Sequence, residues 1–272
     1  MDISVILDNG RPWSEIRELA LAAEDLGVYA VYVCDHFMED RQDGRTDDSP
    51  FLECGTLLAG LAATTQRVRL GALVMGSTYR HPAVVANMVT TLDHISGGRA
   101  IAGLGAGWQV NEHRAYGIDL LPPADLSDRF EETVAVVSSL LRQERTTFDG
   151  RFFTLTDAPN KPAPVQERLP VLVAGGGERR TLPTAARYAD VWHVWGKPDS
   201  FAAKSAKLDE ACAAIGRDPA EVRRATGFPT PVGADLRAEL EPYRAVCDEF
   251  VVFDWTDRPM ESTLTDLRAA VA

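Results

Sequence analysis

The sequence of 272 residues lacks the patterns that mark membrane, secreted and metal-binding proteins. It contains no run of about 18 apolar residues, so we expect no membrane-spanning helix. The N-terminal stretch MDISVILDNG has neither a basic flank nor an apolar signal core, which predicts a cytoplasmic protein. The four cysteines show no CxxC spacing, and no group of His, Asp or Glu has the spacing of metal ligands. We therefore expect reduced thiols and no bound metal.

Basic charge is also scarce. Lys and Arg together number 28 against 40 Asp and Glu, which gives a net charge of −12. Nucleic-acid-binding proteins carry a basic face, so this balance argues against such a partner, although a local site can still bind an anionic cofactor. Hydrophobic residues make up 45% of the chain, which excludes a disordered protein. We expect a small-molecule substrate, with neither nucleic acid nor membrane as a partner.

Short β-branched runs alternate with longer amphipathic runs along the whole chain. The strands predicted from these runs are Ile3–Leu7, Ala30–Cys34, Val68–Val74, Ala100–Leu104, Pro170–Ala174, Asp190–Val194, Glu221–Thr226 and Glu249–Phe253. The helices predicted between and after them are Trp13–Leu26, Phe51–Ala63, Pro82–Ile95, Asp125–Arg142, Glu178–Tyr188, Asp199–Ile215, Ala234–Val246 and Glu261–Val271.

Eight strand–helix units of about 34 residues each predict a single α/β domain over residues 1–272, a (β/α)8 TIM barrel. The alternative is an open doubly wound sheet, which the absence of GxGxxG after the first strand disfavours. Two stretches are longer than a barrel loop, Gly105–Pro123 after the fourth strand and Thr146–Arg168 before the fifth. The second contains a possible hairpin with Asp149 and Gly150 at its turn, and such insertions often wall a substrate pocket.

The carboxyl ends of the strands carry the chemistry in such a barrel. Polar or glycine-rich residues follow the strands at Asp8–Asn9, Asp35–Phe37, Met75–Thr78, Gly105–Trp108, Gly175–Arg180, Trp195 and Asp254, with His193 just inside the sixth strand. Glycosidase chemistry would need two carboxylates about 5–10 Å apart, for which Asp35 and Asp254 are the plausible pair. No Gly-x-Ser-x-Gly elbow of a serine hydrolase is present.

The sequence Gly175-Gly176-Gly177 joins the fifth strand to the next helix, and Glu178, Arg179 and Arg180 follow it. Glycines let the backbone approach an anion, and a helix N-terminus offers free N–H groups and the positive end of its dipole. Two arginines add cationic donors. The pattern fits a phosphate site, and it equally fits a tight turn with solvated arginines.

Three ionisable residues at these strand ends are suited to proton transfer. His36 follows Asp35, where it either faces the ring of a bound cofactor or fills the barrel mouth. Glu112 and His113 are adjacent in the long loop, so they form either a proton donor and acceptor or a solvated pair. The indoles of Trp108, Trp192 and Trp195 could wall an aromatic cofactor or fill the core.

Three stretches resemble the bacterial luciferase-like superfamily. AEDLGVYAVYVCDHF (23–37) resembles its first βα region, RVRLGALVMGSTYRHPAVVANMVTTLDHISGGRAIAGLGAGWQVNEHRAYGI (67–118) its most characteristic segment, and VLVAGGGERRTLPTAARYADVWHV (171–194) its phosphate-binding unit. The similarity is greatest to the branch of oxidoreductases that use coenzyme F420, a deazaflavin. The resemblance implies a (β/α)8 barrel with an insertion after strand four.

The resemblance also implies a cofactor position. Asp35 and His36 would lie near the ring, and Gly105, Ala106 and Gly107 would contact the ring or the ribityl chain. The phosphate would bind main-chain N–H groups at Gly176, Gly177, Glu178 and Arg179. A non-prolyl cis peptide would support the ring at Ala72–Leu73 or one bond away.

The implied reaction is hydride transfer between deazaflavin C5 and a small organic substrate, with the protein supplying orientation and a proton. His36 is the first candidate for the residue that handles the proton, and Glu112 is the second. The alternatives are an FMN-dependent monooxygenase and a flavin- or deazaflavin-binding protein without turnover. The resemblance further implies a homodimer formed through the helices Phe51–Ala63 and Pro82–Ile95.

Overall fold

The computed structural model describes residues 1–41, 43–229, 235–254 and 258–272. Its main sheet is parallel throughout, and the pairing of β3 (Arg69–Ala72) with β5 (Ala100–Gly105) closes it into the predicted eight-stranded barrel. The remaining strands of this sheet in the described part of the chain are β1 (Asp2–Leu7), β2 (Ala30–Val33), β4 (Met75–Gly76), β8 (Val171–Ala174), β9 (Val191–His193), β10 (Arg223–Thr226) and β11 (Glu249–Phe253).

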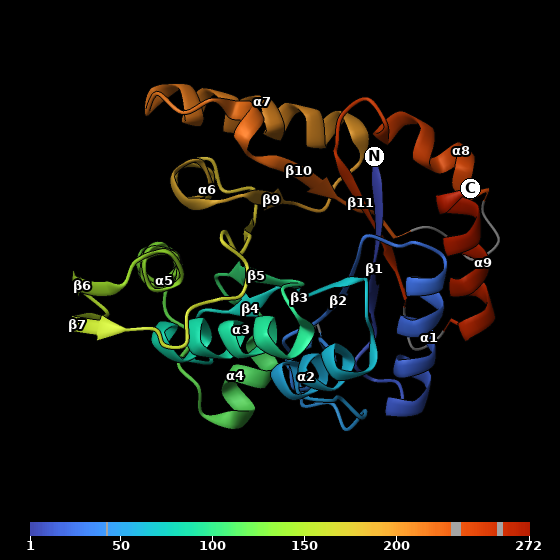
Figure 1. The fold of residues 1–272 in the computed structure, drawn as a ribbon, viewed down its shortest axis with the longest axis horizontal. Coiled ribbons are helices and arrows are strands. Elements are labelled where there is room, and N and C mark those ends of the chain that lie inside the picture. The colour runs from blue at the N-terminus through green and yellow to red at the C-terminus, as the bar shows by residue number, and fades with distance from the viewer. Residues whose placement is uncertain (42, 230–234, 255–257) are drawn as a thin grey trace.

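Helices surround this barrel on all sides in Figure 1. They are α1 (Trp13–Asp25), α2 (Cys54–Thr64), α3 (Pro82–Ser96), α5 (Pro123–Arg142), α6 (Thr181–Tyr188), α7 (Pro198–Ala214), α8 (Leu236–Leu240) and α9 (Met260–Val271). The sequence sets the ends of α3 locally. Pro82 occupies its first turn, the His81 ring accepts from the N–H of Ala83, and Gly97 ends it with a left-handed φ of 69°. None of the helices described is long and apolar enough to cross a membrane.

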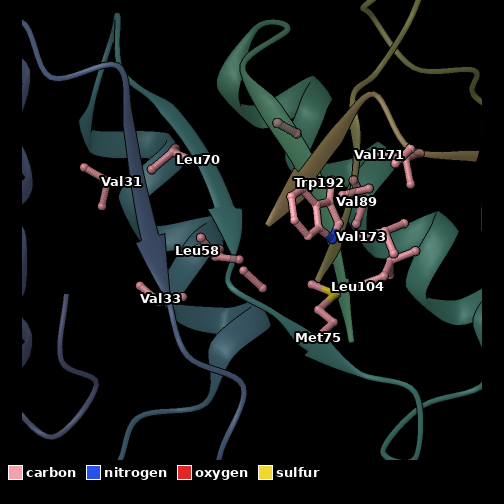
Figure 2. Packing of buried hydrophobic residues seen from close by; sticks show 14 of the residues in the cluster. Val31, Val33, Leu58, Leu70, Met75, Val89, Leu104, Val171, Val173 and Trp192 are labelled. Atoms are coloured by element: carbon pink, nitrogen blue, oxygen red, sulfur yellow. The ribbon is translucent and has the colours of Figure 1, made fainter. Parts of the chain in front are cut away.

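Side chains alternate between two buried clusters along each strand. On β2, Ala30 and Tyr32 point into the barrel, whereas Val31 and Val33 pack outward against the helices. Figure 2 shows part of the outer cluster, with Val31 and Val33 on one strand and Trp192 among its members. This division gives the barrel a filled interior and leaves its carboxyl-end rim to the loops.

Several element boundaries differ from the sequence prediction. One of them adjoins the glycine-rich turn, where the helix predicted from Glu178 begins only at Thr181, as α6. The predicted strand Val68–Val74 is interrupted between β3 and β4, where Leu73–Val74 is a cis peptide bond, one bond from Ala72–Leu73. The helix predicted from Phe51 begins at Cys54, because the Glu53 carboxylate accepts from the N–H groups of Gly55 and Thr56 and so caps it there.

The predicted helix Ala234–Val246 is shorter than expected. Ala234 lies outside the described residues. The rest contains α8 and then a 3-10 turn (Glu241–Tyr243), because Pro242 cannot donate the backbone hydrogen bond that would continue an α-helix.

The insertion after the fourth barrel strand has two parts. The first is a helix that the sequence analysis missed, α4 (Val110–Tyr116). The second is the predicted hairpin, formed by β6 (Arg145–Asp149) and β7 (Thr154–Pro159), which projects beyond α5 in Figure 1. The carboxylate of Glu132 on α5 accepts from the N–H groups of residues 151–153 and holds the hairpin loop against the barrel.

A carboxyl group is buried at the opposite, amino-terminal end of the barrel. Glu249 Oε1 accepts from the hydroxyls of Ser4 at 2.6 Å and Tyr32 at 2.9 Å, whereas its Oε2 has no hydrogen-bond partner in the described part of the chain and lies 4.0 Å from Arg223 Nη2. Burial raises the pKa of Glu249, although the two hydrogen bonds oppose that shift. A raised pKa in the folded state means that the free energy of unfolding falls as pH rises above the ordinary glutamate value.

We therefore expect Glu249→Gln to reduce the loss of stability between pH 5 and pH 8. The amide keeps an acceptor for Ser4 and Tyr32 but carries no charge to bury. Urea unfolding at both pH values should give a smaller difference for the variant than for the wild type, with the variant at least as stable at pH 8. Equal differences in the two proteins would contradict the buried-charge explanation.

Candidate functional site

A cavity of about 590 Å³ opens at the carboxyl ends of the barrel strands. This volume suits a small organic ligand or cofactor. Six of the residues expected near a cofactor line it, namely Asp35, His36, Leu73, Gly105, Ala106 and Gly107. Ala72, by contrast, is buried in the outer cluster below the cavity. Gly105 belongs there for a steric reason, because a Cβ on it would come within 2.3 Å of Val74.

The centre of this site is the carboxylate of Glu112, which is fully buried beneath the cavity wall. Its Oε1 lies 2.7 Å from His36 Nδ1 and accepts from the hydroxyl of Tyr79, and its Oε2 accepts from the Phe37 N–H at 2.7 Å. Burial alone would raise the pKa of Glu112, but these hydrogen bonds outweigh it and lower that pKa. The carboxylate therefore stays ionised at neutral pH and can accept the Nδ1–H of His36.

The short helix α4 brings Glu112 to His36. Gln109 and Asn111 donate to the carbonyl oxygens of Met38 and Glu39, both at 2.9 Å, so α4 is fastened to the loop after β2. The connection between β2, which ends at Val33, and α2, which begins at Cys54, is therefore long, and the sequence analysis did not single it out. His113, the neighbour of Glu112, bonds Thr78 and the Gln109 carbonyl and so has a structural role.

Asp35 and Asp254, the two carboxylates that glycosidase chemistry would need, each pair with an arginine. Asp35 Oδ2 accepts from Arg80 at 2.7 Å and from the N–H of Gly76, which fixes the short strand β4. The carboxylate of Asp254 accepts hydrogen bonds from Nε and Nη2 of Arg11, at 2.7 and 2.8 Å. Both carboxylates are thus held as structural acceptors, although each also borders the cavity.

The glycine-rich turn lies beside the cavity, with Gly175 and Thr181 on the cavity wall. The φ of Gly175 is +124°, and a Cβ there would meet Thr181 at 3.0 Å. Among the described residues, no acceptor receives the N–H groups of Gly176, Gly177, Glu178 and Arg179. These four residues lie in the turn before α6, which begins at Thr181, and free N–H groups in such a turn are what an anion site requires.

The charged side chains of this turn have different partners. Glu178 pairs with Lys204 at 2.6 Å, and Arg180 pairs with Asp128 on α5. Arg179 is exposed and forms no ion pair with any described residue. Arg179 is therefore the arginine that is available to an incoming phosphate.

The far wall of the cavity is aromatic. His193 packs edge-on against Trp195 with ring centroids 4.0 Å apart, and Trp195 packs in turn against Phe253 at 4.5 Å. Trp108 packs edge-on against His36. Trp192 points outward instead, where its indole N–H donates to the Gly175 carbonyl and supports the glycine turn.

Several functional candidates were missed from the sequence. Tyr79 lies in the quoted YRHP segment, but only its contact with Glu112 distinguishes it from other tyrosines. Phe51 was assigned to a helix, whereas it lines the cavity. Among the described residues no group of three or more His, Cys, Asp or Glu could hold a metal ion.

The Asp35–Arg80 pair offers a direct test of this architecture. Arg80 is 13% exposed and bridges Asp35 and Glu53, so Arg80→Gln should lower the free energy of unfolding by about 3 kcal/mol, because a buried carboxylate loses its partner. Arg268→Gln, which removes an exposed ion pair with Glu261, should change it by less than about 0.5 kcal/mol. Similar effects of the two substitutions in urea unfolding would show that the buried pair is dispensable.

The sequence of the chain is similar to those of known proteins. The family described as luciferase-like monooxygenase matches residues 1–269. A pyrimidine monooxygenase RutA of Escherichia coli is 34% identical over 223 residues, which are 79% of this chain and 57% of that protein. The chain thus spans less than two thirds of the length of such relatives.

Solved structures agree in fold. An F420-dependent secondary alcohol dehydrogenase in complex with an F420–acetone adduct aligns with a TM-score of 0.84 at 18% identity, over 100% of this chain and 98% of the other. The monooxygenase RslO1 from Streptomyces bottropensis aligns with a TM-score of 0.81 at 20% identity and the same coverage. At these identities the likeness shows the fold. With the sequence match along nearly its whole length, the chain belongs to the luciferase-like monooxygenase family.

Proposed function

We propose that the protein is an F420-dependent oxidoreductase that transfers a hydride between deazaflavin C5 and a small organic substrate. The observation that carries this proposal is the His36–Glu112 pair at the wall of an apolar cavity. Reduction of a carbonyl by hydride needs a proton for the oxygen, and oxidation of an alcohol needs a base. The pair supplies either, because Glu112 orients the imidazole and leaves His36 Nε2 without a partner among the described residues.

The residues present fit a flavin-like cofactor. The cavity provides an apolar slot, and the unbonded N–H groups of the glycine turn provide a place for a phosphate. Gly176, Gly177, Glu178 and Arg179 would hold that phosphate, while Asp35, His36, Leu73 and residues 105–107 would border the ring. When bound, the deazaflavin supplies hydride chemistry at its C5 atom.

The protein contributes positioning and proton transfer. Glu112 stays ionised and fixes the tautomer of His36 with the proton on Nδ1, so Nε2 serves as the exchanging atom. Tyr79 and the Phe37 N–H hold Glu112 in place. Trp108 and Phe51, which both pack against His36, keep the imidazole at the edge of the cavity.

The second candidate is an FMN-dependent monooxygenase, and the 34% identity to pyrimidine monooxygenase RutA favours it. The phosphate turn suits both cofactors, since each presents a phosphate. The F420-dependent alcohol dehydrogenase and the monooxygenase RslO1 both align over 100% of this chain and 98% of their own, so the fold is compatible with either candidate. A cofactor-binding protein without turnover would use the same groove but would not need the His36–Glu112 pair.

The decisive test is titration of the purified protein with oxidised F420 and, separately, with FMN, followed by fluorescence quenching. We expect micromolar or tighter binding of F420 and much weaker binding of FMN. The reverse preference would favour the monooxygenase. Binding of neither would overturn the cofactor assignment.

Substitution of the proton-handling pair should separate binding from turnover. Glu112→Gln and His36→Gln should each lower kcat by about 10²- to 10⁴-fold, the range lost with a general acid or base. The dissociation constant for F420 should stay within about threefold in Glu112→Gln, because Glu112 is fully buried and does not line the cavity. Glu144→Gln, an exposed change at the end of α5, is the matched control. A kcat within threefold of wild type in both site variants would exclude this mechanism.

Arg179 should contribute to cofactor affinity through charge. Arg179→Ala is expected to weaken F420 binding about three- to tenfold at low salt, and less at high salt, where screening already weakens the attraction. Arg187→Ala removes an equally exposed arginine of α6 that pairs with Glu131, and it should leave the affinity unchanged. Equal affinities for the two variants at low salt would place the phosphate elsewhere.

A further inference from the structure

The cavity has an unusual charge distribution. No Lys or Arg lines it among the described residues, and the sequence positions outside the description hold no Lys or Arg either. Five carboxylates do line it, and they are Asp8, Asp35, Glu39, Asp40 and Asp254. Two of these are neutralised by Arg80 and Arg11, but the wall as a whole offers no cation to an anionic ligand.

The cavity also holds a polar group that the proposed mechanism does not use. His193 is 1% exposed, and its Nε2 has no hydrogen-bond partner in the described part of the chain. Burial lowers the pKa of His193 to about 3, so the imidazole is neutral at physiological pH. A neutral imidazole can donate or accept one hydrogen bond, and leaving it unmade in a buried site is costly.

The barrel places His193 opposite His36. In the closed strand order, β2 and β9 are separated by β1, β11 and β10 on one side and by β3, β5 and β8 on the other. His36 follows β2 and His193 ends β9, so the two residues line the cavity from opposite sides of the barrel. The small residues Ala174 and Ala225, which pair with His193 in the sheet, leave room beside its ring.

We infer that the site takes an uncharged, mainly apolar ketone or secondary alcohol, whose oxygen His193 binds from the wall opposite His36, and that it rejects carboxylated or phosphorylated substrates. This inference rests on the proposed function. In the reducing direction, the substrate carbon receives a hydride from reduced F420 and its oxygen receives a proton from His36, which yields the alcohol. Oxidation reverses both transfers, with His36 as the acceptor of the proton.

The first arm of the test compares matched substrates with the F420-loaded protein. Cyclohexanone and 3-oxocyclohexane-1-carboxylate share a ring and a ketone, and the second carries in addition a carboxylate group with its negative charge. We expect kcat/KM to favour cyclohexanone by at least tenfold, because the cavity is lined by five carboxylates and by no Lys or Arg among the described residues. A preference for the carboxylate, or equal values for the two ketones, would overturn the inference.

The second arm tests His193 itself. His193→Leu should raise KM for cyclohexanone about three- to tenfold through loss of one hydrogen bond, and His193→Asn, which keeps a neutral hydrogen-bonding group, should recover part of that loss. Binding of oxidised F420 without substrate should not change in either variant. A KM unaffected by His193→Leu would refute the role. Weaker F420 binding would assign the hydrogen bond to the cofactor and refute the substrate role as well.

A third arm separates this inference from the cofactor assignment. Imidazole ¹⁵N spectra of the protein without cofactor should contain one signal that keeps the shift of a neutral imidazole from pH 5 to pH 8, identified as His193 by its loss in His193→Leu. Its signal should shift with cyclohexanone and not with the carboxylate analogue. If F420 fails to bind, the proposed function is wrong. The shift of the His193 signal with cyclohexanone still tests whether the cavity binds an uncharged ketone. If F420 binds and the shift is absent, only the inference falls.

Discussion

A carboxylate that is buried must be met by donors, and this requirement organises the mouth of the barrel. The carboxylate of Glu112 on α4 forms hydrogen bonds with the loop after β2, at His36 and Phe37, and with the hydroxyl of Tyr79. Asp35 binds the N–H of Gly76 in β4 and the side chain of Arg80. Asp254 binds the side chain of Arg11 and the hydroxyl of Thr263 in α9. Each of these carboxylates connects segments that lie far apart in the sequence, and together they hold the rim around the cavity in place.

The two ends of the site have different electrostatic character. At the glycine turn, free backbone N–H groups and Arg179 can receive an anion without any buried cation. In the cavity, the described lining residues include five carboxylates and no Lys or Arg, and His193 is neutral, so no lysine or arginine side chain meets a second anion. A phosphate-bearing cofactor and an uncharged substrate can therefore share one site without competing for the same groups, which suits hydride transfer between them.

Much of this arrangement was predictable from local patterns. The alternation of β-branched and amphipathic runs predicted the barrel, because each strand is buried on both faces and each helix on one. The glycine turn was predicted from residue type, since its backbone function depends on the glycines at 175–177 themselves. The predicted start of the second helix at Phe51 was wrong, since α2 begins at Cys54. The Glu53 side chain caps the helix there, and the position of this cap depends on the fold of the preceding loop.

The contacts of the site were much harder to predict. Glu112 was proposed with His113 as a possible pair, but in the structure it bonds His36, which is 76 residues away along the chain. Asp35 was expected beside a cofactor ring, and its bond to Arg80 was not foreseen. His193 was noted only as a residue inside a strand, since burial and an unmade hydrogen bond are properties of the packed interior.

By itself the sequence determined the element order, the fold class, the glycine turn and the family resemblance, because these follow from periodicity and residue type over short windows. The tertiary structure decided which acid serves which base, which arginine remains free and which histidine is left without a partner. Those properties depend on distances of a few ångströms between distant segments, and on the desolvation that packing alone imposes.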